Sequence, residues 1–328
     1  MKAVVFESYG QPEVLKIREI EKPDVPDDAV LVRVRASSIN VAEWYSMTGL
    51  LIGRILSREL FKPKDTRLGA DFAGVVEAVG KNITDFKRGD EVFGGRSGAY
   101  AEYVSVKNAV ALKPANVTME EAASVPTAGI TALQGLRDHG KIQPGQKVLI
   151  HGASGGVGSF AIQIAKAFGA EVTAVCSPQN VEHARRLGAD HVIDYTKEDF
   201  TRNGQQYDLL LNVNGGRSWS EYKRALKPNA TFVLIGAPKT PVVGPIGLLI
   251  KTRLATLRAS QKFVFFIAQF NRADMQVLKE LIESGKVKPF VEKAYPMTRI
   301  ADAMTHLGKG HAQGKIVVTI QSSNTKVP

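Results

Sequence analysis

The pattern of hydrophobic and polar positions changes twice along the chain, and the first region consists of short strand signals. Residues 30–35 alternate apolar and polar side chains, as in a strand with one buried face. Residues 72–80 and 91–94 are further apolar runs, and residues 87–90 between them have the composition of a turn. Closely spaced strands of this kind predict a mostly antiparallel, barrel-like domain over residues 1–125.

The middle of the chain alternates strands with helices. Short apolar runs predict buried strands, and apolar positions three to four residues apart predict helices. We expect strands at residues 147–151, 171–176, 191–194, 208–211 and 231–235, and helices at 157–168 and 181–187. Because strands that alternate with helices form a parallel sheet covered on both faces, residues 126–262 predict a Rossmann domain.

The last part of the chain is expected to return to the first domain. Residues 274–284 have the spacing of an amphipathic helix that ends at Gly285, and residues 314–320 form a closing strand. The predicted fold class is therefore α/β. It combines a Rossmann domain with a doubly wound parallel sheet at 126–262 and a mostly antiparallel β-barrel domain at 1–125 and 263–328.

A glycine-rich loop at residues 150–158 carries the strongest chemical signal. It follows a predicted strand and opens a predicted helix, which is the setting of the dinucleotide-binding fingerprint. Small side chains let the backbone approach a pyrophosphate, and the helix N-terminus offers unpaired amides and a partial positive charge. We prefer this interpretation to a plain tight turn. The candidate cofactor-binding residues of the loop are Ala153, Ser154, Gly155, Gly156, Val157 and Gly158.

The end of the second predicted strand of this domain indicates which nicotinamide cofactor is bound. An acidic residue there would favour NAD by binding the ribose 2′-hydroxyl, but residues 175–180 contain none. Ser177 and Asn180 can instead donate hydrogen bonds to a 2′-phosphate, and Arg185 lies one helical turn further. Ser177 can also cap the following helix, and the two roles are compatible. We therefore expect NADP(H) as the cofactor.

Composition narrows the class of protein. The chain has 328 residues, of which 44% are hydrophobic and 23% charged, which suits a two-domain globular protein. Cys176 is the single cysteine, so an internal disulfide and a thiolate zinc site are both excluded. Residues 1–6 are too short an apolar run for a signal peptide, and four basic residues interrupt the apolar stretch at 241–270. We expect a cytoplasmic location.

The net charge of +11 allows several interpretations. A solvated basic surface is the simplest, and attraction of an anionic cofactor or an anionic membrane surface is the second. The chain has no recognised nucleic-acid-binding module, so we expect no nucleic-acid partner. Residues 247–270 mix basic and apolar side chains and can lie on a membrane surface, although a substrate lid or subunit contact is preferred.

Several motifs in a fixed order resemble one enzyme family. They are Ser-Ser-Ile-Asn at 37–40, Gly-Ala-Asp-Phe-Ala-Gly-Val-Val at 69–76, Ala-Tyr-Ala-Glu-Tyr at 99–103, the segment 122–132, the glycine loop and His-Ala-Gln-Gly-Lys at 311–315. Together they resemble the zinc-free quinone oxidoreductase (zeta-crystallin-like) branch of the medium-chain dehydrogenase/reductase superfamily. Within it, the motif at 311–315 is similar to that of mitochondrial and chloroplast reductases of conjugated carbonyls. The resemblance implies a GroES-like first domain.

The resemblance also implies a reaction class. Zinc-dependent relatives carry a cysteine near residues 38–40 and Gly-His-Glu at residues 69–71, and this chain has neither, so we expect no metal. Hydride delivery from NADPH to a quinone or to the β-carbon of an α,β-unsaturated carbonyl does not need that metal. We expect a small-molecule substrate and a homodimer or a monomer. The alternative is a non-catalytic NADPH-binding or membrane-surface-associated protein of the same fold.

Individual roles follow from the same resemblance. Ser154, Gly156 and Val157 are implied to line the pyrophosphate, and Ser177 and Tyr195 to hold the 2′-phosphate. A surface aromatic at a strand end is the plainer interpretation of Tyr195. We assign five further residues to the cofactor site: Asn214, Gly236, His311, Ala312 and Lys315.

The candidate catalytic residues are Asn40, Tyr45 and Thr127. Asn40 and Thr127 are implied to lie near the nicotinamide, although Asn40 can also be a turn cap. Many relatives have Asn-Pro-x-Asp-Trp-Lys where this chain has residues 40–45, so Tyr45 replaces a lysine that is a candidate proton donor. Tyr45 can supply a phenolic proton instead, and a packing role is the alternative.

Overall fold

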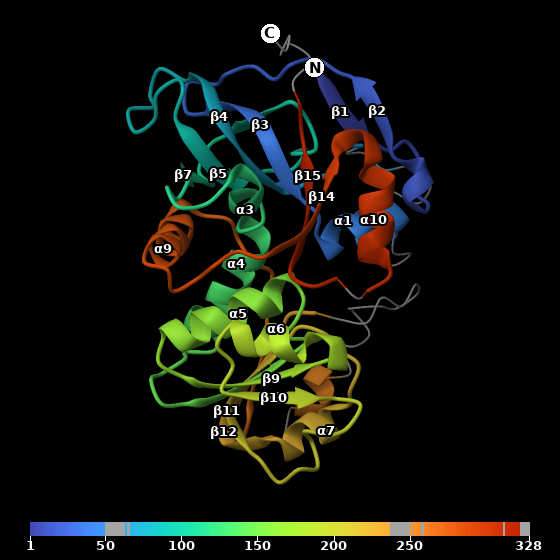
Figure 1. Ribbon diagram of the computed structural model, residues 1–328, viewed down its shortest axis with the longest axis vertical. Coiled ribbons are helices and arrows are strands. Elements are labelled where there is room, and N and C mark those ends of the chain that lie inside the picture. Colours follow the sequence, from blue (N-terminus) through green and yellow to red (C-terminus); the bar gives the residue numbers. More distant parts are fainter. Residues whose placement is uncertain are drawn as a thin grey trace. The chain divides into compact units, whose positions relative to one another are not determined.

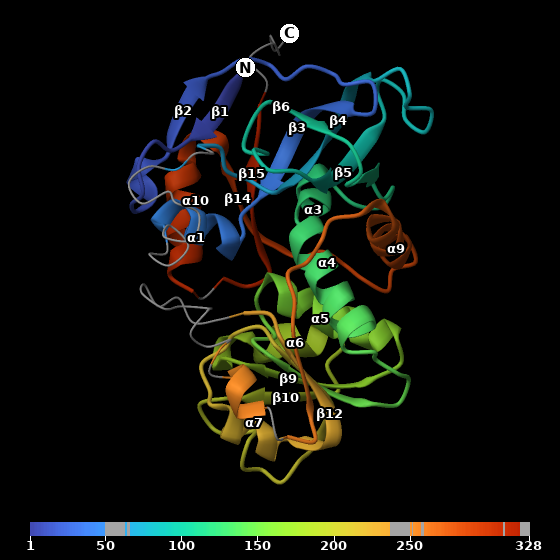
Figure 2. The same ribbon diagram turned by 180° about the vertical axis from the view of Figure 1, so that it is seen from behind.

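The computed structural model describes residues 1–49, 63, 66–236, 250, 252–256, 259–310 and 312–321. The chain forms two compact units (Figures 1 and 2). Unit 1 consists of Met1–Ile130, Phe270–Ser284 and Pro289–Pro328, and unit 2 of Thr131–Gln269 and Gly285–Lys288. His311 lies outside the described residues. So do six residues of the predicted basic–apolar segment at 247–270, namely 247–249, 251, 257 and 258.

Unit 1 contains a seven-stranded sheet. Its strands run in the order β14 (Val291–Pro296), β15 (Lys315–Thr319), β3 (Val30–Ser38), β4 (Asp71–Val79), β5 (Glu91–Gly95) and β7 (Val110–Leu112), with β6 (Tyr103–Val106) also paired to β3. All pairs are antiparallel except β14 with β15. The antiparallel prediction is thus confirmed. Closure into a barrel stays a prediction, because the described pairings run from β14 to β7 as an open path.

The middle of this sheet is formed by segments from both ends of the chain. Figure 1 shows the C-terminal strand β15, in red, beside β3, in blue, and Val317 of β15 is paired with Ser38 of β3. The predicted alternation holds only at Arg33 and Arg35, which are partly exposed, while the other seven residues of β3 are buried. Strand β3 is buried on most of both faces because it pairs with β15, β4 and β6. Strands β1 (Lys2–Val5) and β2 (Lys16–Glu19) form a separate antiparallel pair.

Helices complete unit 1. They are α1 (Val41–Thr48), α3 (Met119–Ala123), α9 (Arg272–Glu283), α10 (Ile300–Gly308) and most of α4 (Pro126–Leu133), and the short 3-10 turns are η1 (Pro12–Val14) and η4 (Met297–Arg299). Helix α9, predicted at 274–284, begins two residues earlier because Asn271 caps it: its Oδ1 accepts a hydrogen bond from Asp274 N at 2.8 Å. Phe72, Tyr100 and Met47 are among the fully buried side chains of the core.

Unit 2 contains a six-stranded sheet in which every pair is parallel. The order is β10 (His191–Asp194), β9 (Glu171–Cys176), β8 (Lys147–His151), β11 (Tyr207–Asn212), β12 (Leu226–Leu234) and β13 (Lys262–Phe265). The first strand of the unit, β8, is therefore central, and the strand order reverses between β8 and β11. Both views place α5 (Gly156–Ala167) and α6 (Val181–Arg186) on one side of this sheet and α7 (Trp219–Arg224) on the other. The predicted Rossmann sheet is confirmed.

The return of the chain to unit 1 comes later than residue 263. Strand β13 pairs with β12 in the register Phe232 with Phe263, so the chain leaves unit 2 only after Gln269. At the other division, α4 passes from unit 1 to unit 2 between Ile130 and Thr131. Among the described residues, none of the helices combines the length and the apolar character needed to cross a membrane.

Candidate functional site

The glycine loop turns sharply out of strand β8. Gly152 has a φ of +89°, a backbone conformation that favours glycine. A Cβ on Gly158 would overlap the carbonyl oxygen of Gly152, so only glycine lets α5 begin this close to the end of the strand. A Cβ on Gly155, in contrast, would have nothing within 4 Å. Two of the glycines thus differ: Gly158 is needed for packing, and the surroundings of Gly155 are open.

The N-terminus of α5 fits a phosphate group. Its N-cap is Gly155, whose missing side chain cannot occupy the amides of the first turn, and that turn contains no acidic residue. These amides have no intrahelical acceptor, and the helix dipole adds a partial positive charge. The predicted loop residues Ser154, Gly156 and Val157 are partly exposed here, whereas Ala153 is buried. The geometry therefore matches the expected pyrophosphate site.

Two more predicted cofactor residues lie beside this loop. Asn214 follows β11, and a Cβ on Gly152 would come within 2.9 Å of the Asn214 Cβ. Gly236 follows β12, and a Cβ there would overlap the carbonyl oxygen of Val213. The loops after β8, β11 and β12 consequently meet where the strand order reverses. In open parallel sheets, ligands bind outside the carboxyl ends of the strands at this point.

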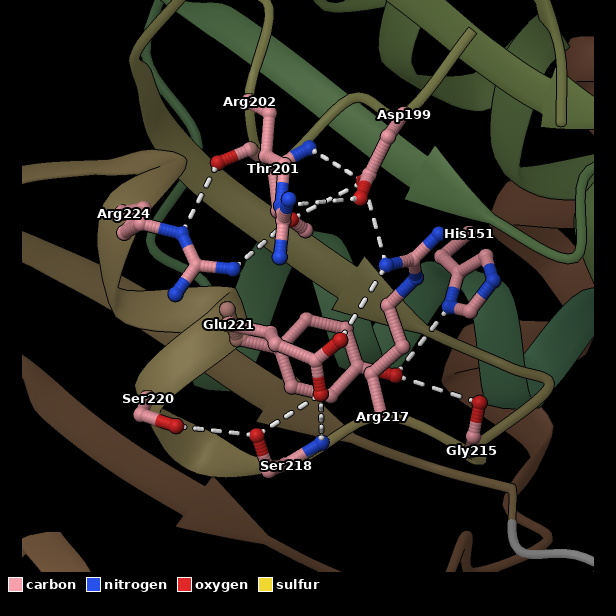
Figure 3. Close-up of polar contacts among 11 residues, drawn as sticks. His151, Asp199, Thr201, Arg202, Gly215, Arg217, Ser218, Ser220, Glu221 and Arg224 are labelled. Atoms are coloured by element: carbon pink, nitrogen blue, oxygen red, sulfur yellow. Dashed lines mark hydrogen bonds and ion pairs between the residues drawn. The ribbon is translucent and has the colours of Figure 1, made fainter. Parts of the chain in front are cut away.

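A buried hydrogen-bond chain ties two of these loops together (Figure 3). His151 Nδ1 lies 3.1 Å from the hydroxyl of Tyr222, which donates to the carbonyl oxygen of Gly215 at 3.1 Å. Since that hydroxyl proton is used on Gly215, the contact assigns the proton of the neutral imidazole to Nδ1. Gly215 N in turn donates to Asn212 Oδ1 at 2.9 Å. The last residue of β8 thus fixes the loop that follows β11.

Charged side chains surround this chain. Arg217 Nη1 lies 3.0 Å from Asp199 Oδ1 and 3.3 Å from Glu221 Oε1 (Figure 3). Its guanidinium also lies over the ring of Phe200. Burial, with a smaller contribution from the nearby Arg217 cation, lowers the pKa of His151 to about 4. The imidazole is therefore neutral at physiological pH. No local sequence pattern predicts a role for His151, because its partner Tyr222 comes from a distant part of the chain.

The predicted 2′-phosphate residues lie on neighbouring strand ends. Ser177 follows β9, Tyr195 follows β10, and Tyr195 N donates to the carbonyl oxygen of Cys176 at 3.2 Å. Asn180 is buried, and its Nδ2 donates to Ser177 Oγ at 2.9 Å, so Asn180 orients the serine hydroxyl. Tyr195 is 49% exposed. The Asp194 carboxylate lies nearby, but it accepts hydrogen bonds from the backbone and hydroxyl of Thr196.

Unit 1 contains a second cluster, centred on the buried carboxylate of Asp71. Ser38 Oγ and Asn40 Nδ2 donate to its Oδ2 at 2.5 and 3.0 Å. Thr127 donates to its Oδ1 from the backbone N at 2.8 Å and from Oγ1 at 2.5 Å. Lys315 Nζ lies 3.6 Å from Oδ2. Three predicted residues, Asn40, Thr127 and Lys315, are thus brought together around one carboxylate that was not predicted.

The sheet topology explains this meeting. Strand β3 ends at Ser38, and β4 begins at Asp71 on the antiparallel neighbour. Strand β15 begins at Lys315 on the other side of β3. Three strand ends therefore converge where α1 and α4 begin. Thr127 N belongs to the first turn of α4, where a carboxylate is favourable.

Asn40 is held on all sides. Its Oδ1 accepts a hydrogen bond from Lys315 Nζ, which also donates to the carbonyl oxygen of Ile39 at 3.0 Å. Its backbone N donates to Glu43 Oε2 at 2.8 Å, so Glu43 closes the start of α1 as the acidic member of a capping box. The pKa of Glu43 is raised to about 7. Burial is the main cause, the Asp71 carboxylate contributes to the rise, and Lys315 partly offsets it. Asn40 therefore both caps helix α1 and bonds to the Asp71 carboxylate.

Asp71 and Glu43 were not among the predicted site residues. Glu43 has a sequence signal, because an acid three residues after an N-cap asparagine is typical of a capping box. Asp71 has a weaker one, a carboxylate at the head of an apolar strand. The predicted residue Tyr45 is half-buried on α1, where burial raises its pKa. Ala312 is half-buried, and His311 lies outside the described residues.

Within the part of the chain that the structure describes, no group of three or more histidine, cysteine, aspartate or glutamate side chains is arranged to hold a metal ion. Lys315 and Ser38 contact Asp71, so a cation and a hydroxyl occupy the surroundings of this carboxylate. The donor set around Asp71 is that of a hydrogen-bonded ion pair.

Comparison with known proteins identifies the fold and the family. Residues 26–116 match the model of the alcohol dehydrogenase GroES-like domain, and residues 187–318 match the model of the zinc-binding dehydrogenase family. The mitochondrial NAD(P)H oxidoreductase RTN4IP1 of Bos taurus is 33% identical over 98% of this chain and 89% of its own length. The chloroplastic NADPH-dependent alkenal/one oxidoreductase of Arabidopsis thaliana is 34% identical over 97% of this chain and 79% of its own.

A solved structure shows the same relationship. The quinone oxidoreductase of Escherichia coli, solved in complex with NADPH, superposes with a TM-score of 0.82 at 26% identity, over 97% of this chain and 100% of that one. Sequence relatives over nearly the whole chain and structural agreement over both units lead to one conclusion. The chain belongs to the zinc-free quinone oxidoreductase branch of the medium-chain dehydrogenase/reductase superfamily.

Proposed function

We propose that this protein is an NADPH-dependent oxidoreductase that delivers hydride to an α,β-unsaturated carbonyl or to a quinone. The observation that carries the proposal is the glycine loop at the point where the strand order reverses. Its open helix N-terminus fits a pyrophosphate, and relatives that match nearly the whole chain are named NAD(P)H oxidoreductase and NADPH-dependent alkenal/one oxidoreductase.

The cofactor is held by residues of unit 2. The amides of Gly156 and Val157 face the pyrophosphate, and Ser177, oriented by Asn180, donates to the 2′-phosphate. Tyr195 lies on the neighbouring strand end, where it would hold the 2′-phosphate together with Ser177. When bound, NADPH supplies a hydride from C4 of its nicotinamide.

The residues of unit 1 orient the substrate and supply a proton. The Asn40 amide and the Thr127 hydroxyl are locked by Asp71, so they present fixed groups. Tyr45 is the candidate proton donor: its phenol is protonated at neutral pH, burial raises its pKa further, and it can stabilise a developing enolate or quinol oxyanion.

Isotope transfer tests the reaction class. An enone incubated with NADPH deuterated on the transferred face gains deuterium at its β-carbon. Tyr45→Phe lowers the rate by about 100-fold or more if the phenol contacts the developing charge. Tyr103→Phe is the matched control and keeps full activity. Faster turnover of simple alcohols than of enones and quinones would overturn the proposed reaction. Full activity of both Tyr45→Phe and Asn40→Ala would show that the assignment of these unit 1 residues to the substrate site is wrong.

Cofactor preference is tested at Ser177. Titration of the protein with NADPH and NADH gives tighter binding of NADPH. Ser177→Asp places a carboxylate beside the 2′-phosphate and weakens NADPH binding by about 1 kcal/mol or more, through like-charge repulsion. Ser177→Asn, a neutral change of similar size, has a smaller effect. Tighter binding of NADH by the unchanged protein contradicts the NADPH assignment.

The proposed reaction is independent of metal. Activity persists after exhaustive chelation, because this chain has no cysteine in the region 38–40 and has Gly-Ala-Asp at 69–71, where zinc-dependent relatives carry a cysteine and Gly-His-Glu. Stoichiometric zinc in the purified protein, with activity lost on its removal, would contradict this. The homodimeric or monomeric state and the cytoplasmic location stay predictions.

A further inference from the structure

A basic pocket on unit 1 lies apart from both residue clusters described above. It has a volume of about 360 Å³ and is formed by β14, η4 and α10. Three cationic side chains line it, Lys293, Arg299 and Lys309, and Asp302 is the one carboxylate among the lining residues. None of the lining residues belongs to the proposed cofactor or substrate site. The pocket therefore needs its own explanation.

The sequence builds this pocket from two regular faces. Lys293 and Tyr295 are two residues apart on β14, so their side chains share one face of the strand. Asp302, Thr305, His306 and Lys309 have the spacing of one helical face, from α10 to the residue after it. Arg299, at the end of η4, lies between the two elements. A helix face and a strand face thus converge with their polar side chains toward one cavity.

The Asp302 and Glu292 carboxylates near the pocket already have partners. Arg299 Nε lies 2.6 Å from Asp302 Oδ2, and His306 Nε2 lies 3.4 Å from Glu292 Oε1. The other nitrogen of His306 contacts the Tyr295 hydroxyl at 3.2 Å. Among the described residues, Lys293 and Lys309 have no carboxylate at ion-pairing distance. Two exposed ammonium groups consequently remain without a counter-charge beside this open pocket, and that of Lys293 also lies 5.1 Å from the centre of the Tyr295 ring.

The arrangement selects a particular ligand chemistry. Two ammonium groups and a guanidinium provide charged donors from several directions, which suits the oxygens of a phosphate dianion. The Thr305 hydroxyl already donates to the carbonyl oxygen of Ala301 at 2.8 Å, and the Tyr295 hydroxyl contacts His306 Nδ1, so the charged side chains supply the donors for a ligand. A volume of about 360 Å³ also leaves room for a small organic group beside the phosphate. We infer that this pocket binds a phosphate monoester, as a second site independent of NADP(H).

Titration with simple phosphates tests the site. The probes are inorganic phosphate and glycerol 3-phosphate, measured by calorimetry on the full chain at low and moderate salt. Lys293→Gln/Lys309→Gln weakens binding by at least about tenfold, the effect of losing two charge-assisted hydrogen bonds. Lys81→Gln/Lys87→Gln, also exposed lysines of unit 1, removes the same net charge and leaves affinity within about twofold. Thermal unfolding checks that both variants remain folded.

Each remaining outcome decides the inference. No binding of either phosphate, or equal weakening in both variants, overturns it, because the attraction would then be absent or diffuse. NADPH affinity of Lys293→Gln/Lys309→Gln stays unchanged; a parallel loss would place the pocket in the cofactor site and overturn the second site. Vesicles of phosphatidylcholine with and without phosphatidic acid distinguish a free phosphate monoester from a lipid headgroup. Selective binding to the acidic vesicles that is lost in Lys293→Gln/Lys309→Gln assigns the phosphate to a lipid headgroup.

Discussion

Lys315 Nζ and Asp71 Oδ2 lie 3.6 Å apart in the interior of unit 1, where their side chains are 4% and 0% exposed. The pair joins β15, the last strand along the chain, to the start of β4. Ser38 donates a hydrogen bond to Asp71, and Asn40 accepts one from Lys315. Buried pairs of this kind contribute little net stability, but loss of one partner leaves the other charge buried and uncompensated.

Lys315→Met should therefore be strongly destabilising. We expect the free energy of unfolding to fall by roughly 3–5 kcal/mol, measured by denaturant titration. Lys107→Met is the matched control: its partner Asp28 lies at 2.9 Å, but both side chains are more than half exposed, so loss of that pair should have little effect on stability. Similar losses in the two variants would show that the buried pair has no special role.

Glu43 should make stability decrease as the pH rises. Its pKa is raised from 4.5 to about 7 in the folded chain, so the folded state binds the extra proton between these values. The contribution of Glu43 to the free energy of unfolding is complete below about pH 4.5, at roughly 3 kcal/mol, and is lost by about pH 7. Glu43→Gln removes this dependence. The difference in unfolding free energy between the two proteins should fall across that window, and a constant difference would contradict the raised pKa.

His151 should act in the opposite direction. Its pKa is lowered from 6.5 to about 4, so the unfolded state binds more protons between these values. Its contribution is complete above about pH 6.5 and is lost as the pH falls to about 4, again by roughly 3 kcal/mol at most. His151→Gln keeps a polar side chain that does not titrate, so the unfolding free energy of this variant should depend less on pH between about 4 and 6.5. His191→Gln, at an exposed histidine, is the control for general titration.

Tyr222→Phe tests the hydrogen-bond chain between the loops after β8 and β11. The ring is kept, while His151 Nδ1 and the Gly215 carbonyl lose their partner, at a cost of about 1–3 kcal/mol. Because Asn214 lies against Gly152, NADPH binding measured by fluorescence titration should also weaken several-fold. Unchanged NADPH affinity with reduced stability would limit Tyr222 to a structural role.

The two glycines of the loop should separate folding from binding. Gly158→Ala places a methyl group against the Gly152 carbonyl and should lower the unfolding temperature. Gly155→Ala has open space and an ordinary φ of −75°, so the protein should fold normally. If the pyrophosphate occupies that space, Gly155→Ala still weakens NADPH binding by about tenfold or more. Normal NADPH affinity of Gly155→Ala would mean that the phosphates lie elsewhere.

Local patterns predicted the Rossmann unit well. Strands β8, β9 and β10 were predicted with their observed ends, since each is a short buried run bounded by turn residues. The glycine loop was found for the same reason: its residues are contiguous. In contrast, Lys315 and Asn40 are 275 positions apart, and no local pattern shows that they meet. Lys315 was therefore grouped with the cofactor residues, and Asp71, which joins it to Asn40 and Thr127, was overlooked.

Strand β13 shows a different reason for error. Residues 262–265 are too short a run to reveal which sheet they join, and pairing with β12 decides it. The antiparallel character of unit 1 followed from the spacing of turns, whereas the order of its strands depends on contacts between distant segments.

The position of β15 between β14 and β3 determines when each part of the protein can form during synthesis. Every strand of the parallel sheet has been made once Phe265 leaves the ribosome, so that unit can complete its sheet while translation continues. Unit 1 must wait about 50 residues longer, because Lys315 is the cation that balances Asp71 and holds Asn40. A nascent chain stalled before Lys315 therefore carries its nucleotide-binding sheet but an unfinished first unit, with the Asp71 carboxylate still lacking its counter-charge.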